Sequence, residues 1–137
     1  LSMFFLLFIP LIASAQDTLW TPQHVAKLRI VTEAVISPDG TQVAYVLAVP
    51  RDLSKEKDGP SWTELHVVDT KGNSTPFVTG PVNVGQIAWT PDGKALIVDA
   101  QDTLENPLFR VDVATGKVTR LTREGTAHNA RPLKDGS

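Results

Sequence analysis

The chain has 137 residues, about enough for one ordinary domain, and its 42% apolar and 20% charged content is typical of a globular protein. Its formal net charge of −2, with acidic and basic residues interspersed, excludes a nucleic-acid-binding groove and a polybasic membrane face. It contains no cysteine, which excludes disulfides and thiolate metal sites.

The first residues predict a secretory signal peptide, residues 1–15. An apolar run over residues 3–12 is followed by Ala13-Ser14-Ala15, the small-residue pattern of a cleavage site. We expect cleavage between Ala15 and Gln16 and a secreted or periplasmic protein without a stable membrane anchor, because the run is too short to span a bilayer. The chain opens with Leu and no basic residue precedes the run, which fits a clipped start or a true start at Met3. The alternative is a buried strand or helix.

Residues 16–31 predict an N-terminal capping helix segment. Thr21 is a suitable N-cap, and Pro22 suits the first helical position. The spacing predicts a hydrophobic staple before and after the cap and a short apolar stripe, formed by Trp20, Val25 and Leu28.

From residue 32 onward the pattern is that of strands joined by tight turns. A strand over residues 34–37 precedes the turn Pro38-Asp39-Gly40, in which Pro fixes φ, Asp bonds backbone amides and Gly takes positive φ. The returning strand covers residues 41–49; because residues 43–49 are apolar throughout, we expect both of its faces to be covered. Further strands are predicted over residues 63–70 and 75–79, on either side of a turn at residues 71–73.

The same order of elements then recurs in QIAWT, PDG, KALIVDA, PLFRVDV, ATGK and VTRLT. Matching landmarks lie 43 residues apart: Asp69 and Asp112, Thr79 and Thr122, Gly93 and Gly136. A period of this length with four strands per unit is typical of propeller blades. The sequence therefore predicts an all-β fold, an incomplete β-propeller preceded by a short helix. Its expected parts are a first blade at about 33–80, a second at about 85–123 and the start of a third at 127–137.

Propellers close with roughly four to eight blades, and an open end exposes a sheet face and an edge. We therefore expect this sequence to be the N-terminal fragment of a longer protein. The isolated chain should fold poorly unless it oligomerises, and the sequence leaves its oligomeric state open.

The start of the chain and its repeats resemble a known family, the prolyl oligopeptidase family of serine peptidases. The likeness is chiefly to its bacterial acylaminoacyl-peptidase and dipeptidyl-peptidase-like members. The N-terminal positions that match are Thr21, Pro22, His24, Val25, Leu28, Val35, Ser37, Pro38, Asp39, Gly40, Val43, Ala44 and Tyr45. The later half-blades that match are residues 65–69 with 77–79, and residues 108–112 with 121–122.

The resemblance implies a two-part enzyme in which the propeller restricts access of peptide substrates to a C-terminal α/β-hydrolase domain. The catalytic serine would lie in a G-x-S-x-G motif, followed by Asp and His. No G-x-S-x-G occurs in this sequence, so we predict no catalytic residue, and equally no metal or cofactor site, within it. The alternative is a periplasmic, TolB-like propeller that binds protein partners without catalysis, because the PDG turn is common to both classes.

The polar residues that could suggest a site also have structural interpretations. We expect His24, His66 and His128 to be structural, because their spacing matches no metal-ligand pattern. The turn aspartates could form a carboxylate cluster, but turn capping fits their positions better. They are Asp39, Asp92 and Asp135, and similarly Asp69 and Asp112.

Three further features carry open alternatives. Ser37 precedes a proline in the first turn and lacks the surroundings of a nucleophile. The polar insertion, residues 50–61, is either a solvated loop or a segment that contacts the catalytic domain or lines substrate access. We expect it to project opposite the PDG turns. We expect Trp62 and Trp89 at strand starts; core packing is expected for Trp89, with an aromatic ligand platform as the alternative.

Overall fold

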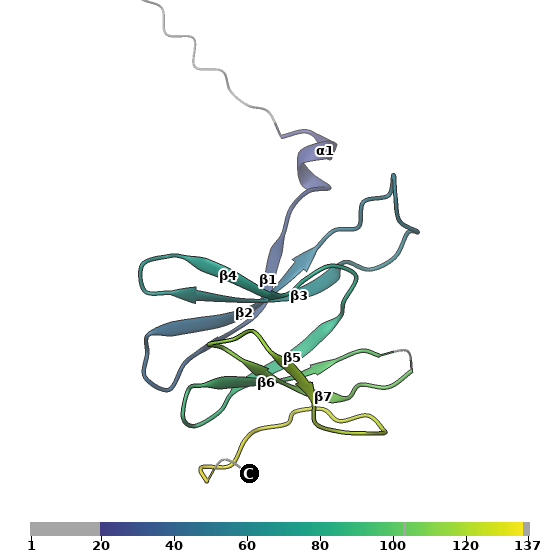
Figure 1. Cartoon of the computed structure of the whole chain (residues 1–137). Helices are drawn as coiled ribbons and strands as arrows, with labels where there is room; N and C mark the ends of the chain where they lie inside the picture. The colour runs from purple at the N-terminus through teal and green to yellow at the C-terminus, as the bar shows by residue number, and fades with distance from the viewer. Residues whose placement is uncertain (1–19, 103, 136–137) are drawn as a thin grey trace, which may run out of the picture.

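The computed structural model describes residues 20–102 and 104–135, so the predicted signal peptide lies outside the described residues. The described chain forms one short helix and eight strands (Figure 1). None of its helical segments has the length and hydropathy that crossing a membrane requires. The elements are α1 (Pro22–Val25), β1 (Ile30–Ile36), β2 (Gln42–Val49), β3 (Trp62–Asp69), β4 (Ser74–Val78), β5 (Val84–Trp89), β6 (Ala95–Ala100), β7 (Leu108–Asp112) and β8 (Val118–Arg120).

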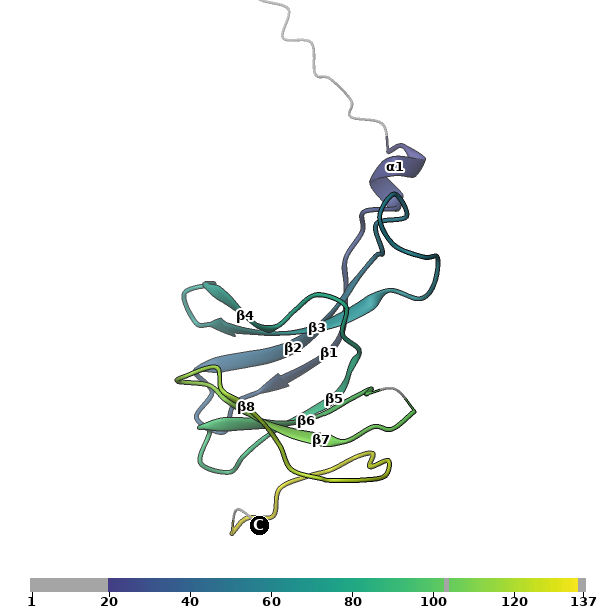
Figure 2. The ribbon, with the colours of Figure 1, turned by 45° about the vertical axis from the view of Figure 1, so that its right-hand side comes forward.

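The strands form two antiparallel four-stranded sheets in simple chain order, β1-β2-β3-β4 and β5-β6-β7-β8. Figures 1 and 2 show one sheet stacked on the other. The predicted PDG turns join the first two strands of each sheet. Gly40 and Gly93 have φ of 72° and 67°, in the left-handed region that a residue with a Cβ rarely adopts. The two predicted four-stranded units are therefore confirmed.

The first strand begins earlier than the sequence indicated. The sequence predicted a capping segment over residues 16–31, with the propeller beginning at residue 32 and its first strand over residues 34–37. In the structure β1 already starts at Ile30. The reason lies in the long partner strand: Ile30 pairs with Ala48 and Val31 with Leu47, beyond a register shift before Glu33. From first strand to last, the two sheets span residues 30–78 and 84–120. The sequence predicted blades over residues 33–80 and 85–123.

The N-terminal helix has the predicted cap but not the predicted apolar contacts. Thr21 is the N-cap and Pro22 opens the helix, and His24 closes a capping box with Thr21. The predicted staple and stripe are wrong, because Val25 and Leu28 are 56% and 45% exposed. A helix of four residues presents too little surface to bury an apolar stripe.

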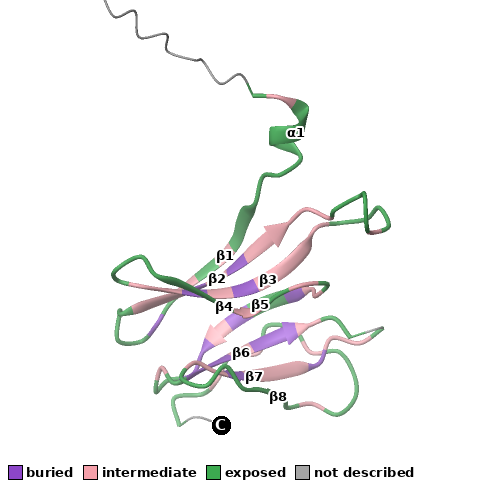
Figure 3. Cartoon of the chain, turned by 45° about the horizontal axis from the view of Figure 1, so that its top comes forward, coloured by how far each residue is buried: buried purple, intermediate pink, exposed green. Residues whose placement is uncertain are grey.

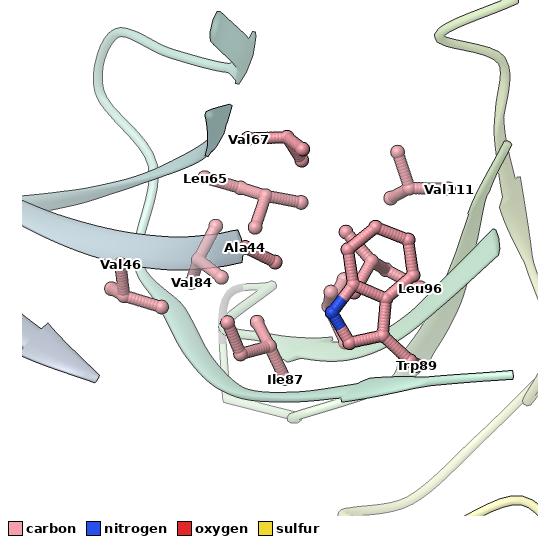
Figure 4. Packing of buried hydrophobic residues seen from close by; sticks show 10 residues of the cluster. Ala44, Val46, Leu65, Val67, Val84, Ile87, Trp89, Leu96 and Val111 are labelled. Atoms are coloured by element: carbon pink, nitrogen blue, oxygen red, sulfur yellow. The ribbon is translucent and has the colours of Figure 1, made fainter. Parts of the chain in front are cut away.

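The core is a single apolar layer between the two sheets. Figure 4 shows side chains of the first sheet facing those of the second. The first sheet contributes Ala44, Val46, Leu65 and Val67, and the second contributes Val84, Ile87, Trp89, Leu96, Val98 and Val111.

Trp89 joins the two sheets by a hydrogen bond as well as by packing. Its ring is buried, as predicted, and its Nε1–H donates to the carbonyl oxygen of Val35 at 3.0 Å. β1 is an edge strand, so some of its backbone groups lack partners within the sheet. The indole supplies one such partner from the neighbouring sheet.

Only one face of β2 is fully covered, contrary to the expectation for residues 43–49. Ala44 and Val46 are 0% and 1% exposed, whereas the alternate side chains Val43, Tyr45 and Leu47 are half-buried. Figure 3 shows buried positions along strands of both sheets, with intermediate positions between them. Apolar residues at every position of a strand allow two covered faces, but a neighbouring sheet must supply the cover.

A hydrogen bond one period later joins the positions that correspond to Thr63 and Val84 of the joint between the sheets, with the donor reversed. Thr63 donates its backbone N–H to Val82 O at 3.0 Å and its hydroxyl to Val84 O at 2.7 Å. The residues 43 positions after Thr63 and Val84 are Asn106 and Ala127, and the Ala127 N–H donates to Asn106 O at 3.0 Å. The segment after residue 126 thus begins to follow the second sheet as β5 follows the first, although no strand forms among the described residues beyond Arg120.

Replacing Trp89 tests the joint. The Trp89→Phe change keeps an aromatic ring but leaves the part-buried Val35 carbonyl without its donor, which should lower the free energy of unfolding by about 1–3 kcal/mol. Urea unfolding of the intact protein, followed by circular dichroism, measures the loss. The matched control is Trp20→Phe, at an indole that is 72% exposed, where we expect no change. Equal stability of the two variants would contradict a structural role for the Trp89 hydrogen bond.

Candidate functional site

The insertion between β2 and β3 is an ordered loop closed by its own hydrogen bonds. Asp52 accepts hydrogen bonds from the Ser54 hydroxyl at 2.5 Å and the Ser54 backbone N–H at 3.1 Å, and its other oxygen lies 2.9 Å from Lys55 Nζ. The Ser54 hydroxyl and then Lys55 lower the pKa of Asp52 to about 2. The carboxylate therefore stays ionised and holds one turn of the loop at any physiological pH.

A second set of contacts ties the loop to the start of β3. The Arg51 guanidinium lies 3.9 Å from the centre of the Trp62 ring, and its Nε–H donates to Pro60 O at 2.7 Å. Glu56 accepts from Trp62 Nε1–H at 2.9 Å and from the Asp52 N–H at 3.0 Å. The ring of Trp62 is thus engaged within the chain. This arrangement argues against the ligand platform that the sequence left open.

The loop and the N-terminal helix segment border an open cleft of about 740 Å³. Figure 2 shows α1 beside the loop at the end of the first sheet. The cleft is lined by both apolar and charged side chains, and cationic and anionic groups face it. The residues that line the cleft from the helix side are Gln23, Ala26, Lys27 and Arg29. Those that line it from the loop side are Val49, Pro50, Arg51, Asp52, Leu53, Ser54, Asp58, Gly59 and Ser61.

Asp39 and Asp92 cap their turns, as predicted. Asp39 accepts from the Ser37 hydroxyl at 2.6 Å and the Thr41 N–H at 3.1 Å, and Asp92 accepts from the Thr90 hydroxyl at 2.6 Å and the Lys94 N–H at 3.0 Å. Asp69 and Asp112 accept from turn amides in the same way. The hydroxyl contributes most to the lowered pKa of Asp39 and of Asp92, and Asn73 contributes most to that of Asp69.

Ser37 has no nucleophilic arrangement. It is 5% exposed, its hydroxyl donates to Asp39, and the same oxygen accepts the Gln42 N–H at 3.0 Å. Thr90 holds the corresponding place in the second sheet with the same kinds of bond. Because equivalent hydroxyls make the same bonds in both repeats, their role is to stabilise the turn.

The three histidines lie apart, and no described group of three His, Asp or Glu residues is arranged to hold a metal ion. His24 belongs to the helix cap. His66 stacks on Tyr45 with ring centroids 5.3 Å apart, and its Nε2 lies 3.1 Å from Glu64. Burial opposes ionisation of Glu64, but the Gly80 N–H and His66 together lower its pKa.

The sequence analysis did not identify a buried acid on the outward face of the second sheet. Asp99 is 8% exposed and accepts a hydrogen bond from the Gln86 N–H within the β5 register shift. Its other oxygen lies 3.6 Å from His128 Nδ1, and Asn129 N–H donates to the Gln86 side chain at 2.9 Å. A Cβ on Gly85 would lie 2.6 Å from the Asp99 carboxylate, so a side chain at this position would displace that group. The only sequence signal was an acid inside the apolar strand ALIVDA.

Comparison with solved structures identifies the two sheets as propeller blades. TolB from Acinetobacter baumannii matches with a TM-score of 0.56 and 20% identity, over 77% of this chain and 25% of TolB. Puromycin hydrolase matches with a TM-score of 0.52 and 33% identity, over 69% of this chain and 14% of that protein. The chain therefore spans a quarter or less of either protein. Neither a protein-family profile nor a curated protein sequence matches it.

The loop contacts predict a titration at Trp62. The Trp62 indole and the Asp52 N–H lower the pKa of Glu56 below the usual glutamate value. At a pH above the usual value the carboxylate is ionised and accepts both hydrogen bonds. They are lost as the pH falls through the lowered pKa of the folded protein. The Trp62 indole N–H resonance, followed by NMR, should shift with a midpoint below that of an unperturbed glutamate. In Glu56→Gln this step should vanish; its persistence in that variant would contradict the contact.

Proposed function

We propose that this chain is the N-terminal part of the propeller of an exported serine peptidase that hydrolyses short peptides. The supporting observation is the 33% identity with puromycin hydrolase, because propellers related only by fold share less, as the 20% with TolB illustrates. The resemblance of the sequence to the prolyl oligopeptidase family supports the same class. Export rests on the apolar run and Ala13-Ser14-Ala15 near the N-terminus.

In this proposal the chain restricts substrate access and supports the catalytic domain. The reaction itself takes place in an α/β-hydrolase domain further along the protein. A serine activated by His and Asp would attack the peptide carbonyl, form an acyl-enzyme and release the amine, with an oxyanion hole stabilising the tetrahedral intermediate. The blades would exclude large substrates. The segment from Ala127 would open the third blade, since its bond to Asn106 joins the positions that correspond to Val84 and Thr63.

The insertion and its cleft are proposed to face the peptide path or the catalytic domain. The PDG turn and the insertion lie at opposite ends of the first sheet (Figure 1), so they belong to opposite rims of the propeller. The loop is held by ionic and cation–π contacts, as a surface for a partner requires. Cations at Lys27 and Arg29 and anions at Asp52 and Asp58 line the cleft, and a peptide carries both charges at its ends.

The second candidate is a TolB-like propeller that binds protein partners without catalysis. The observation that favours it is the higher TM-score with TolB, 0.56 against 0.52, over a larger share of this chain. The two functions differ in whether the intact protein contains a reactive serine.

The decisive experiment treats the intact protein with a fluorophosphonate probe and assays it with aminoacyl and short peptidyl p-nitroanilides. The proposal predicts one labelled serine outside this chain and hydrolysis that labelling abolishes. Heat-denatured protein controls for non-specific labelling. Absence of both labelling and hydrolysis would favour the TolB-like candidate.

Replacing residues 51–60 by a short Gly-Ser turn in the intact enzyme tests the role of the insertion. We expect KM for a peptide substrate to change while the rate with a small ester stays the same, because the change affects access and leaves the chemistry intact. The control replaces the turn at residues 71–73, at the opposite end of the first sheet from the insertion. Unchanged kinetics and stability after removal of the insertion would exclude this role.

A further inference from the structure

Three Asp-Gly pairs lie among the described residues: Asp39-Gly40, Asp58-Gly59 and Asp92-Gly93. In such a pair the glycine nitrogen can attack the aspartate Cγ. The N–Cγ bond forms, the carboxyl C–O bond breaks, and the oxygen leaves as water from the protonated acid. The resulting succinimide takes up water at either carbonyl, giving aspartate or isoaspartate. Glycine permits this because it has no Cβ to hinder the approach.

The pairs in the two PDG turns are held away from this reaction. Gly40 N–H donates to Ser37 O and Gly93 N–H donates to Thr90 O, each at 2.9 Å, so both nitrogens are held in turn hydrogen bonds. Their carboxylates are turned forward to the amides of Thr41 and Lys94. The lowered pKa of each acid, caused first by the neighbouring hydroxyl, also makes the protonated form scarce.

The pair in the insertion is arranged differently. Gly59 N–H donates to its neighbour's own carboxylate, Asp58 Oδ1, at 2.8 Å, so the attacking nitrogen and the carboxyl group lie against each other. No hydrogen bond or ion pair draws the Asp58 carboxylate toward another residue of the described chain. Asp58 is exposed, so water can reach the succinimide.

We propose that Asp58-Gly59 is a site of spontaneous isomerisation to isoaspartate in the folded protein. In isoaspartate the backbone runs through the side-chain Cβ and Cγ of residue 58, so the main chain becomes one carbon longer at this position. Gly59 lines the cleft, and the next residue, Pro60, accepts the Arg51 Nε–H bond at 2.7 Å. The modification therefore loosens the Arg51 contact with Trp62 and alters one wall of the cleft as the protein ages.

The test ages the intact protein at neutral pH, then quantifies isoaspartate at each Asp-Gly pair by peptide mapping with electron-transfer fragmentation. In the folded protein we expect isoaspartate at Asp58 to form about tenfold faster than at Asp39 or Asp92, a ratio equal to about 1.4 kcal/mol in activation free energy. In urea the three rates should converge, because the local geometry is lost. Equal rates in the folded state would overturn the proposal.

Two variants separate the chemistry from loop stability. Asp58→Glu keeps the charge but must form a slower six-membered ring, and Gly59→Ala adds a Cβ that hinders attack. That Cβ would lie 2.9 Å from Arg51 Cζ, so Gly59→Ala also displaces the guanidinium that covers Trp62. Both variants should suppress the modification, and Asp58→Glu, which leaves the Arg51 contact in place, should also keep the Trp62 indole resonance. Unchanged isoaspartate at residue 58 in Gly59→Ala would also contradict the proposal.

Discussion

The contact between the two sheets is the constraint on which the rest of the structure depends. A four-stranded sheet of this composition has apolar side chains on both faces and can bury neither alone. Trp89 belongs to this contact, where it lies beside Leu96 and donates a hydrogen bond to the Val35 carbonyl of the edge strand. Packing and hydrogen bonding between the two sheets therefore act here through one side chain.

The two repeats share the same backbone positions, but equivalent positions can carry residues of different polarity. Counted from the PDG turns, Val46 and Asp99 are equivalent residues on the faces that look toward the next unit. Val46 packs in the apolar layer, whereas Asp99 binds the Gln86 amide and lies close to His128. Units with the same backbone can thus present an apolar joint on one side and a polar joint on the other.

The insertion shows how a polar segment becomes ordered without a core of its own. Its charged side chains bond to neighbours within a few residues, and the Arg51 guanidinium lies over the Trp62 ring. Each exposed ion pair contributes little by itself. Their common attachment to the end of β3 gives the loop a defined shape, and the cleft beside α1 follows from that shape.

The sequence by itself determined the local features, because each depends on a few adjacent residues. Pro, Asp and Gly dictate the turns at residues 38–40 and 91–93, Thr21 and Pro22 start the helix, and the 43-residue period implies stacked four-stranded units. Only the tertiary structure decided which face of β2 is covered and where β1 begins. It also decided that Asp99 and Arg51 have partners. These features depend on contacts between residues distant in the chain, and a single sequence carries no record of which distant residues meet.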